Sequence, residues 1–99
     1  MKPFWVYILR CSDNSYYTGH TDNLDHRIAQ HNAGDIAGCY TASRLPVTLA
    51  FSQPCATRAE ALSAERQIKG WSRAKKRTLI DGTFDLLPEL ARNHQVEQR

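Results

Sequence analysis

The sequence lacks several features that would assign it to a class at once. No apolar run approaches the roughly 20 residues that a membrane-spanning helix needs. Its three cysteines, Cys11, Cys39 and Cys55, are odd in number and form no CxxC pair, so neither a disulfide framework nor a zinc site is predicted. No linker, repeat or low-complexity segment divides the 99 residues. We therefore expect one domain over residues 1–92 and a polar, frayed tail at 93–99.

The amino terminus also lacks a targeting sequence. Strand-like residues begin at Phe4, which leaves no room for a signal peptide or a transit peptide. With no apolar span either, the expected location is the cytoplasm, with no membrane partner.

Acidic residues are absent between Glu65 and Asp81, although the whole chain carries a net charge of only +3. The basic residues of this gap are Arg66, Lys69, Arg73, Lys75, Lys76 and Arg77. Such a local concentration favours contact with a polyanion. A solvated helix surface that is kept soluble by its charge is the alternative interpretation.

Three segments have the alternation and the aromatic or β-branched residues of strands. They are Phe4–Arg10, Tyr16–Thr21 and Val47–Ser52, the last ended by Pro54. A hairpin connects the first two, and its register is open. A three-residue loop at 12–14 would put Tyr7, Leu9, Tyr17 and Gly19 on one face, whereas a two-residue loop would separate the two tyrosines.

Capping residues and apolar spacing predict helices in the rest of the chain. We expect helices at 24–32, from the Thr57 cap to about Lys69, from the Ser72 cap to Ile80, and a short one among Phe84–Leu90. Asp35–Ser43 has no apolar periodicity and is predicted to be a loop.

Glu65 falls within the apolar stripe of its predicted helix, among Ala61, Leu62 and Ile68. Burial of an unpaired carboxylate costs several kcal/mol, so this side chain needs a partner. One candidate is Lys69, four residues further along the helix. The other is a divalent cation, Mg²⁺ or Mn²⁺, because the chain offers oxygen ligands rather than sulfur clusters.

Four further side chains have both a structural and a chemical interpretation. Tyr7 and Tyr17 suit a hairpin core, and Arg27 and His31 suit a solvated helix face. A phosphodiester reaction, however, needs a group that orients or deprotonates water, cations that stabilise charge on phosphate, and an acid or metal at the leaving oxygen. Tyrosine, arginine, histidine and a metal-bound glutamate supply that set.

In order along the chain, Val6-Tyr7-Ile8, Tyr17-Thr18-Gly19, Arg27, His31 and Glu65 resemble the GIY-YIG endonucleases. The stretches 40–47 and 68–73 resemble the small stand-alone bacterial members of that family. The resemblance covers roughly residues 4–80. Trp5 stands where the motif that names the family has glycine, and Thr18 stands where it has isoleucine. Cys39 and Ala42 lie where this branch often has basic residues.

The resemblance implies an α+β fold with a three-stranded antiparallel sheet flanked by helices. It also implies cleavage of DNA phosphodiester bonds with one divalent metal, bound by Glu65. Tyr7 would contact or deprotonate the attacking water, Tyr17 would help to position it, and Arg27 would stabilise the transition state. His20 and His31 would assist, and the sequence leaves open whether Tyr7 or a histidine takes the proton.

Arg44 and the basic run at 66–77 are the expected DNA contacts. Because no sequence-reading module is present, we expect the protein to select DNA by its structure, or a protein partner to supply the target. The expected substrate is branched, single-stranded or duplex DNA, and the expected setting is repair or recombination. Two other functions stay open at this point. One is a nucleic-acid-binding or adaptor domain with little catalysis, and the other is an interaction domain with no role on nucleic acid.

Overall fold

The structure is a computed structural model of the chain and describes residues 2–36, 38–86 and 88. Two of the sequence predictions lie partly or wholly outside these residues: the short helix among 84–90 in part, and the tail at 93–99 entirely. No helix in the described part of the chain is long and apolar enough to cross a membrane.

Three strands form an antiparallel sheet in the order β2-β1-β3, which confirms the predicted fold class. The strands are β1 (Phe4–Arg10), β2 (Tyr16–Thr21) and β3 (Thr48–Cys55). Leu9 pairs with Tyr17 and Tyr7 pairs with Gly19, which is the register of the three-residue loop. Asn14, the last residue of that loop, has the positive φ of 67° that this turn requires. The two tyrosines therefore share a face.

The third strand is longer than predicted, and the expectation that Pro54 ends it is wrong. Pro54 lies inside β3, opposite Trp5 of β1. Because β3 is an edge strand, a residue without an N–H is tolerated where that position faces away from the sheet.

Three helices occur where capping residues predicted them: α1 (Leu24–Ala33), α2 (Arg58–Lys69) and α3 (Arg73–Ile80). Asn23, Thr57 and Ser72 accept the first free backbone N–H groups. The predicted loop at 35–43 is corrected in part, because Tyr40–Ser43 forms a short 3-10 helix, η1. That helix is held by local hydrogen bonds that apolar periodicity does not reveal.

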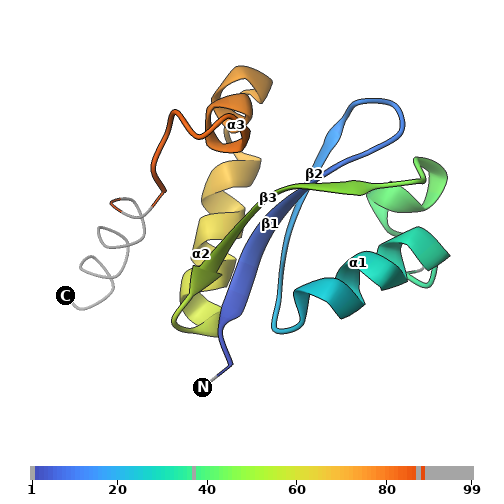
Figure 1. Cartoon of the computed structure of the whole chain (residues 1–99), viewed down its shortest axis with the longest axis horizontal. Coiled ribbons are helices and arrows are strands. Elements are labelled where there is room, and N and C mark those ends of the chain that lie inside the picture. The colour runs from blue at the N-terminus through green and yellow to red at the C-terminus, as the bar shows by residue number, and fades with distance from the viewer. Residues whose placement is uncertain (1, 37, 87, 89–99) are drawn as a thin grey trace.

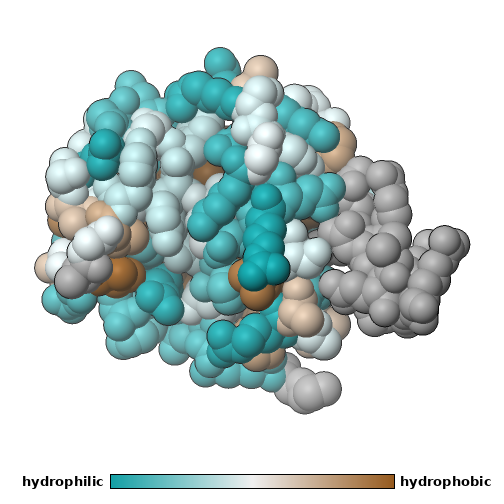
Figure 2. Space-filling view, turned by 180° about the vertical axis from the view of Figure 1, so that it is seen from behind, coloured by the Kyte–Doolittle hydropathy of each residue, from teal (hydrophilic) through white to brown (hydrophobic). Residues whose placement is uncertain are grey.

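The helices cover both faces of the sheet (Figure 1). Val6 and Ile8 of β1 pack with Ala61, Ala64 and Ile68 of α2. The alternate residues Tyr7 and Leu9 face the other way and pack with partly buried residues of α1. The central strand is thus buried on both sides. The outer surface of the molecule, seen from behind in Figure 2, is mainly hydrophilic.

Candidate active site

Gly19 of the edge strand β2 leaves the space that the Tyr7 side chain occupies. The Tyr7 side chain is almost fully buried, at 2% exposure. A Cβ atom at Gly19 would lie 2.6 Å from the Tyr7 hydroxyl oxygen and 3.2 Å from Cε2 of Tyr17. The absence of a side chain at position 19 therefore lets the Tyr7 hydroxyl lie against β2 beside the Tyr17 ring.

A chain of hydrogen bonds extends from the Tyr7 hydroxyl across the α1 side of the sheet. Tyr7 Oη lies 3.1 Å from Nε2 of His31, and Nδ1 of His31 lies 2.8 Å from Oγ1 of Thr41. The Thr41 hydroxyl lies 3.4 Å from Sγ of Cys39. Thr41 and Cys39 were not predicted as site residues, and the signal that could have found them is the polar segment at 39–43, which folds into η1.

Glu65 approaches β2 from the opposite face. Its Oε1 lies 2.8 Å from Nδ1 of His20, and its Oε2 lies 3.1 Å from Nζ of Lys69. The predicted Glu65–Lys69 pair is therefore present, and His20 is a second partner of the same carboxylate. Burial alone would raise the pKa of the Glu65 carboxyl, but the hydrogen bonds from His20 and Lys69 outweigh burial and lower that pKa.

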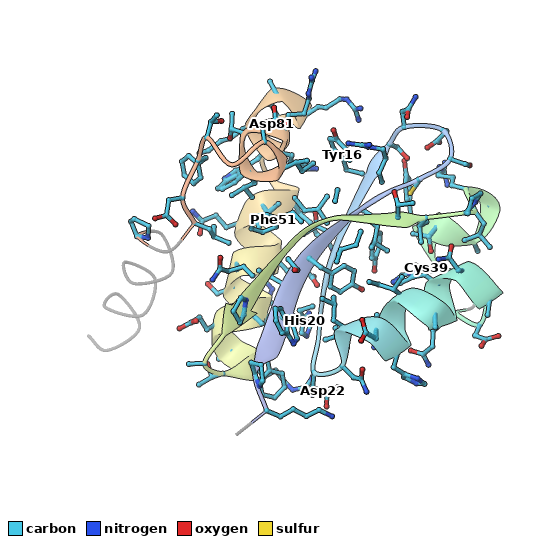
Figure 3. All side chains as sticks on the ribbon, viewed as in Figure 1. Tyr16, His20, Asp22, Cys39, Phe51 and Asp81 are labelled. Atoms are coloured by element: carbon cyan, nitrogen blue, oxygen red, sulfur yellow. The ribbon has the colours of Figure 1, made fainter. Side chains whose placement is uncertain are left out.

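The two halves meet at the edge of the sheet that β2 forms. Lys69, which bonds to Glu65, has its Nζ 6.0 Å from the centroid of the Tyr17 ring. In Figure 3, Cys39 lies between the sheet and α1, and His20 lies nearer to α2.

The charges of the site act on both tyrosines. Burial is the main cause that raises the pKa of Tyr7 and raises the pKa of Tyr17 to about 12. The Glu65 carboxylate raises both pKa values further, and the Arg27 guanidinium opposes the rise in both. Both phenols therefore stay protonated at neutral pH. The structure thus brings Tyr7, Tyr17 and His31 together on one face of the sheet, and His20 and Glu65 together on the other. The Arg27 charge acts on Tyr7, Tyr17 and His31.

Glu65 fits the metal that the sequence predicted, although as a single ligand. Within the described residues, no group of three or more His, Cys, Asp or Glu side chains could hold a metal ion. Its lowered pKa keeps the carboxylate ionised. Mg²⁺ is commonly bound through one or two carboxylates together with substrate phosphates and water, so one ionised carboxylate at an open edge suits it.

The predicted DNA contacts do not form one uniform surface. Arg73 lies 4.2 Å above the Tyr16 ring, next to the site. Arg44 is held in place by Asp13 at 3.0 Å and by the Tyr40 ring at 3.8 Å. Lys75 lies 4.2 Å above Trp71, which packs on Phe84 rather than standing free. Arg66 and Arg77 are exposed and Lys76 is half-buried.

The buried His31 makes the stability of the fold depend on pH. Burial, and next the Arg27 charge, lower the pKa of His31 from its ordinary value of 6.5. As pH falls below about 6.5, the unfolded chain takes up a proton on this histidine at a higher pH than the native state does, so the free energy of unfolding falls. We expect urea unfolding to show less stability at pH 5.5 than at pH 7.5, by at most about 1.4 kcal/mol per pH unit from this group.

The control for this pH effect is His31→Gln, which keeps the other three histidines. The variant should be less stable at pH 7.5 but should lose less stability than the wild type between the two pH values. An equal loss in both proteins would show that His31 does not carry the effect.

The fold thus combines a three-stranded antiparallel sheet with two tyrosines and a histidine on one face and a glutamate on the other. Residues 3–78 match the family described as the GIY-YIG catalytic domain. The chain belongs to the GIY-YIG family, whose members are nucleases in general.

The relatives are small proteins of the group named UPF0213. One from Lacticaseibacillus paracasei is 41% identical over 98 residues, which span 99% of this chain and 97% of the relative. One from Staphylococcus haemolyticus is 44% identical over 81 residues, or 82% of this chain and 98% of the relative. The solution structure of a protein from E. faecalis is 32% identical, with a TM-score of 0.58 over 84% of this chain and 88% of that protein.

Proposed function

We propose that this protein is a divalent-metal-dependent endonuclease that hydrolyses phosphodiester bonds in DNA. The observation that carries the proposal is that two sets of side chains lie on the two faces of the edge strand β2, with Lys69 of one set 6.0 Å from the Tyr17 ring of the other. Tyr7 with its hydrogen bond to His31 comes from one face, and the ionised Glu65 comes from the other. A scissile phosphate at this edge would have a water-orienting group on one side and a metal ligand on the other.

The chain's own residues account for most of the chemistry. The protonated Tyr7 hydroxyl would hold the attacking water, and Tyr17 would help to orient it. The Arg27 guanidinium would stabilise the negative charge that develops on the phosphate oxygens. Glu65 would hold Mg²⁺ or Mn²⁺ once its bonds to His20 and Lys69 open. When bound, the ion would act as a Lewis acid on the phosphate and its leaving oxygen.

Affinity for DNA would come from basic side chains beside the site. Lys69 and Arg73 border β2, and Arg66 is exposed on the same helix as Glu65. Contacts of this kind bind the phosphate backbone with strong salt dependence and without reading the base sequence. We therefore propose that the protein selects DNA by its structure and that a partner protein helps to target it. The proposed setting is DNA repair or recombination.

One observation favours a binding or adaptor domain without catalysis. Both oxygens of Glu65 already have cationic or hydrogen-bonding partners, so this carboxylate does not need a metal to be stable in the fold. Such a domain would bind DNA equally well with a chelator present and would never cut it.

The test is cleavage of labelled branched, single-stranded and duplex DNA by the purified protein with Mg²⁺, with Mn²⁺ and with a chelator. Binding is measured in parallel at rising salt. We expect cutting that stops when metal is removed, and affinity that falls steeply with salt. Metal-independent binding with no cutting on any substrate would favour the adaptor domain, and salt-independent or absent binding would remove nucleic acid from the function.

A further inference from the structure

The imidazole of His31 has a hydrogen-bond partner on each ring nitrogen and is closed off from solvent. His31 is 2% exposed and Thr41 is 1% exposed. Nε2 lies 3.1 Å from the Tyr7 hydroxyl, and Nδ1 lies 2.8 Å from the Thr41 hydroxyl. A neutral imidazole has one N–H donor and one acceptor nitrogen. Two arrangements are therefore possible, and each would set the direction of every hydrogen bond from Tyr7 to Thr41.

The surroundings of Thr41 select one of them. Its hydroxyl has a single proton, and the Cys39 sulfur at 3.4 Å accepts it. Burial alone would raise the pKa of Cys39, but hydrogen bonding from the Thr41 hydroxyl and backbone outweighs burial and lowers that pKa, which suits a sulfur that accepts hydrogen bonds. The Thr41 oxygen is then the acceptor for the N–H of His31.

We infer that Thr41 is a positioning residue that fixes His31 as its Nδ1–H tautomer, so that Nε2 is left to accept the proton of the Tyr7 hydroxyl. The groups that face this imidazole are Tyr7, Tyr17, Arg27 and Cys39. With the opposite tautomer, Nε2–H would donate to Tyr7, and His31 could not take up a proton from it.

The catalytic consequence rests on the proposed function. As the water attacks the phosphate, one of its protons passes to the Tyr7 oxygen, and the Tyr7 proton passes to Nε2 of His31. Tyr7 ends neutral, and His31 ends as an imidazolium. Its Nδ1–H donates to the Thr41 hydroxyl, which in turn donates to the Cys39 sulfur. The new bond joins the water oxygen to phosphorus. The electron pair of the broken bond leaves on the departing oxygen, which takes a proton from solvent. The high pKa of Tyr7 fits a hydroxyl that relays protons rather than one that is stored as phenolate.

The test is the ¹⁵N shift pattern of the His31 ring, recorded on protein labelled at histidine and assigned by comparison with His31→Gln. The wild type should show protonated Nδ1 and unprotonated Nε2 at pH 7.5. Thr41→Val removes the acceptor and should shift the population toward Nε2–H, whereas Thr41→Ser should keep the wild-type pattern. Thr48→Val, the same substitution at an exposed position on β3, should change nothing.

Activity gives a second readout on the same set. Thr41→Val should lower kcat by about tenfold with little change in KM, because only the relay is disturbed, and Thr41→Ser should restore it. An Nε2–H pattern in the wild type would overturn the inference, whether or not Thr41→Val folds. An unchanged pattern in folded Thr41→Val would also overturn it. If no substrate is cut, the proposed function fails, but the tautomer of His31 still decides the role of Thr41.

Discussion

Replacement of Glu65 by glutamine is expected to reduce metal-dependent DNA cleavage by at least about a hundredfold while the protein stays folded. Glutamine keeps the size of the side chain and can still bond to His20 and Lys69. It loses the negative charge that a divalent cation requires, in a carboxyl whose pKa is lowered in the native state. DNA binding should persist or become slightly stronger, because one negative charge is removed next to the basic residues.

The matched control for this variant is Glu60→Gln on the same helix. Glu60 lies in the first turn of α2, where its carboxylate accepts the backbone N–H of Ala56 at 3.2 Å, remote from the β2 edge. It should cut DNA at the wild-type rate. Broadening of the Tyr17 and His20 signals by Mn²⁺ gives a direct measure of metal binding that does not depend on turnover. Cleavage by Glu65→Gln at the wild-type rate would show that the metal is held elsewhere.

The elements of this fold could be predicted because their signals are local. Thr57 and Ser72 were expected to cap their helices, and each accepts a backbone N–H of the first turn, as Asn23 does at the start of α1. The hairpin register was not decided by sequence, since both loop lengths suit the same residues. It is settled by the pairing of Leu9 with Tyr17, which buries Tyr7 and Leu9 in one cluster with Cys11.

The sequence named candidate site residues but could not predict the contacts between them. Residue types and spacing indicated Tyr7, His31 and Glu65, yet nothing in the sequence connects His31 to Thr41 or His20 to Glu65. Those contacts join segments 10 and 45 residues apart and depend on how α1, η1 and α2 pack on the sheet. Arg44 shows the converse, because a basic residue that suggested DNA contact is bonded to Asp13 and Tyr40.

Among the glycines, Gly19 is the position where an added methyl group would meet the closest atoms, so Gly19→Ala is expected to destabilise the fold. Gly19 lies in a strand without a positive φ, so alanine is compatible with its backbone and would by itself stabilise the strand by about 0.5–1 kcal/mol. The added Cβ, however, would lie 2.6 Å from Oη and 2.7 Å from Cζ of Tyr7. That ring is buried, so any shift that relieves the clash disturbs the packing around it. We expect a net loss of about 1–3 kcal/mol in the free energy of unfolding, measured by urea denaturation.

The same methyl group should also abolish the proposed DNA cleavage, since relief of the clash would move the Tyr7 hydroxyl away from Nε2 of His31. Gly70→Ala is the control, because the nearest atom to its new Cβ is the Gln67 carbonyl oxygen at an ordinary 3.5 Å. Tyr7→Phe in the Gly19→Ala background removes the atom closest to the clash, so the alanine should cost less there than in the wild type. If Gly19→Ala cost the same with phenylalanine at position 7, or nothing at all, the hydroxyl would not lie against Gly19. The water-orienting role of Tyr7 would then lose its geometric basis.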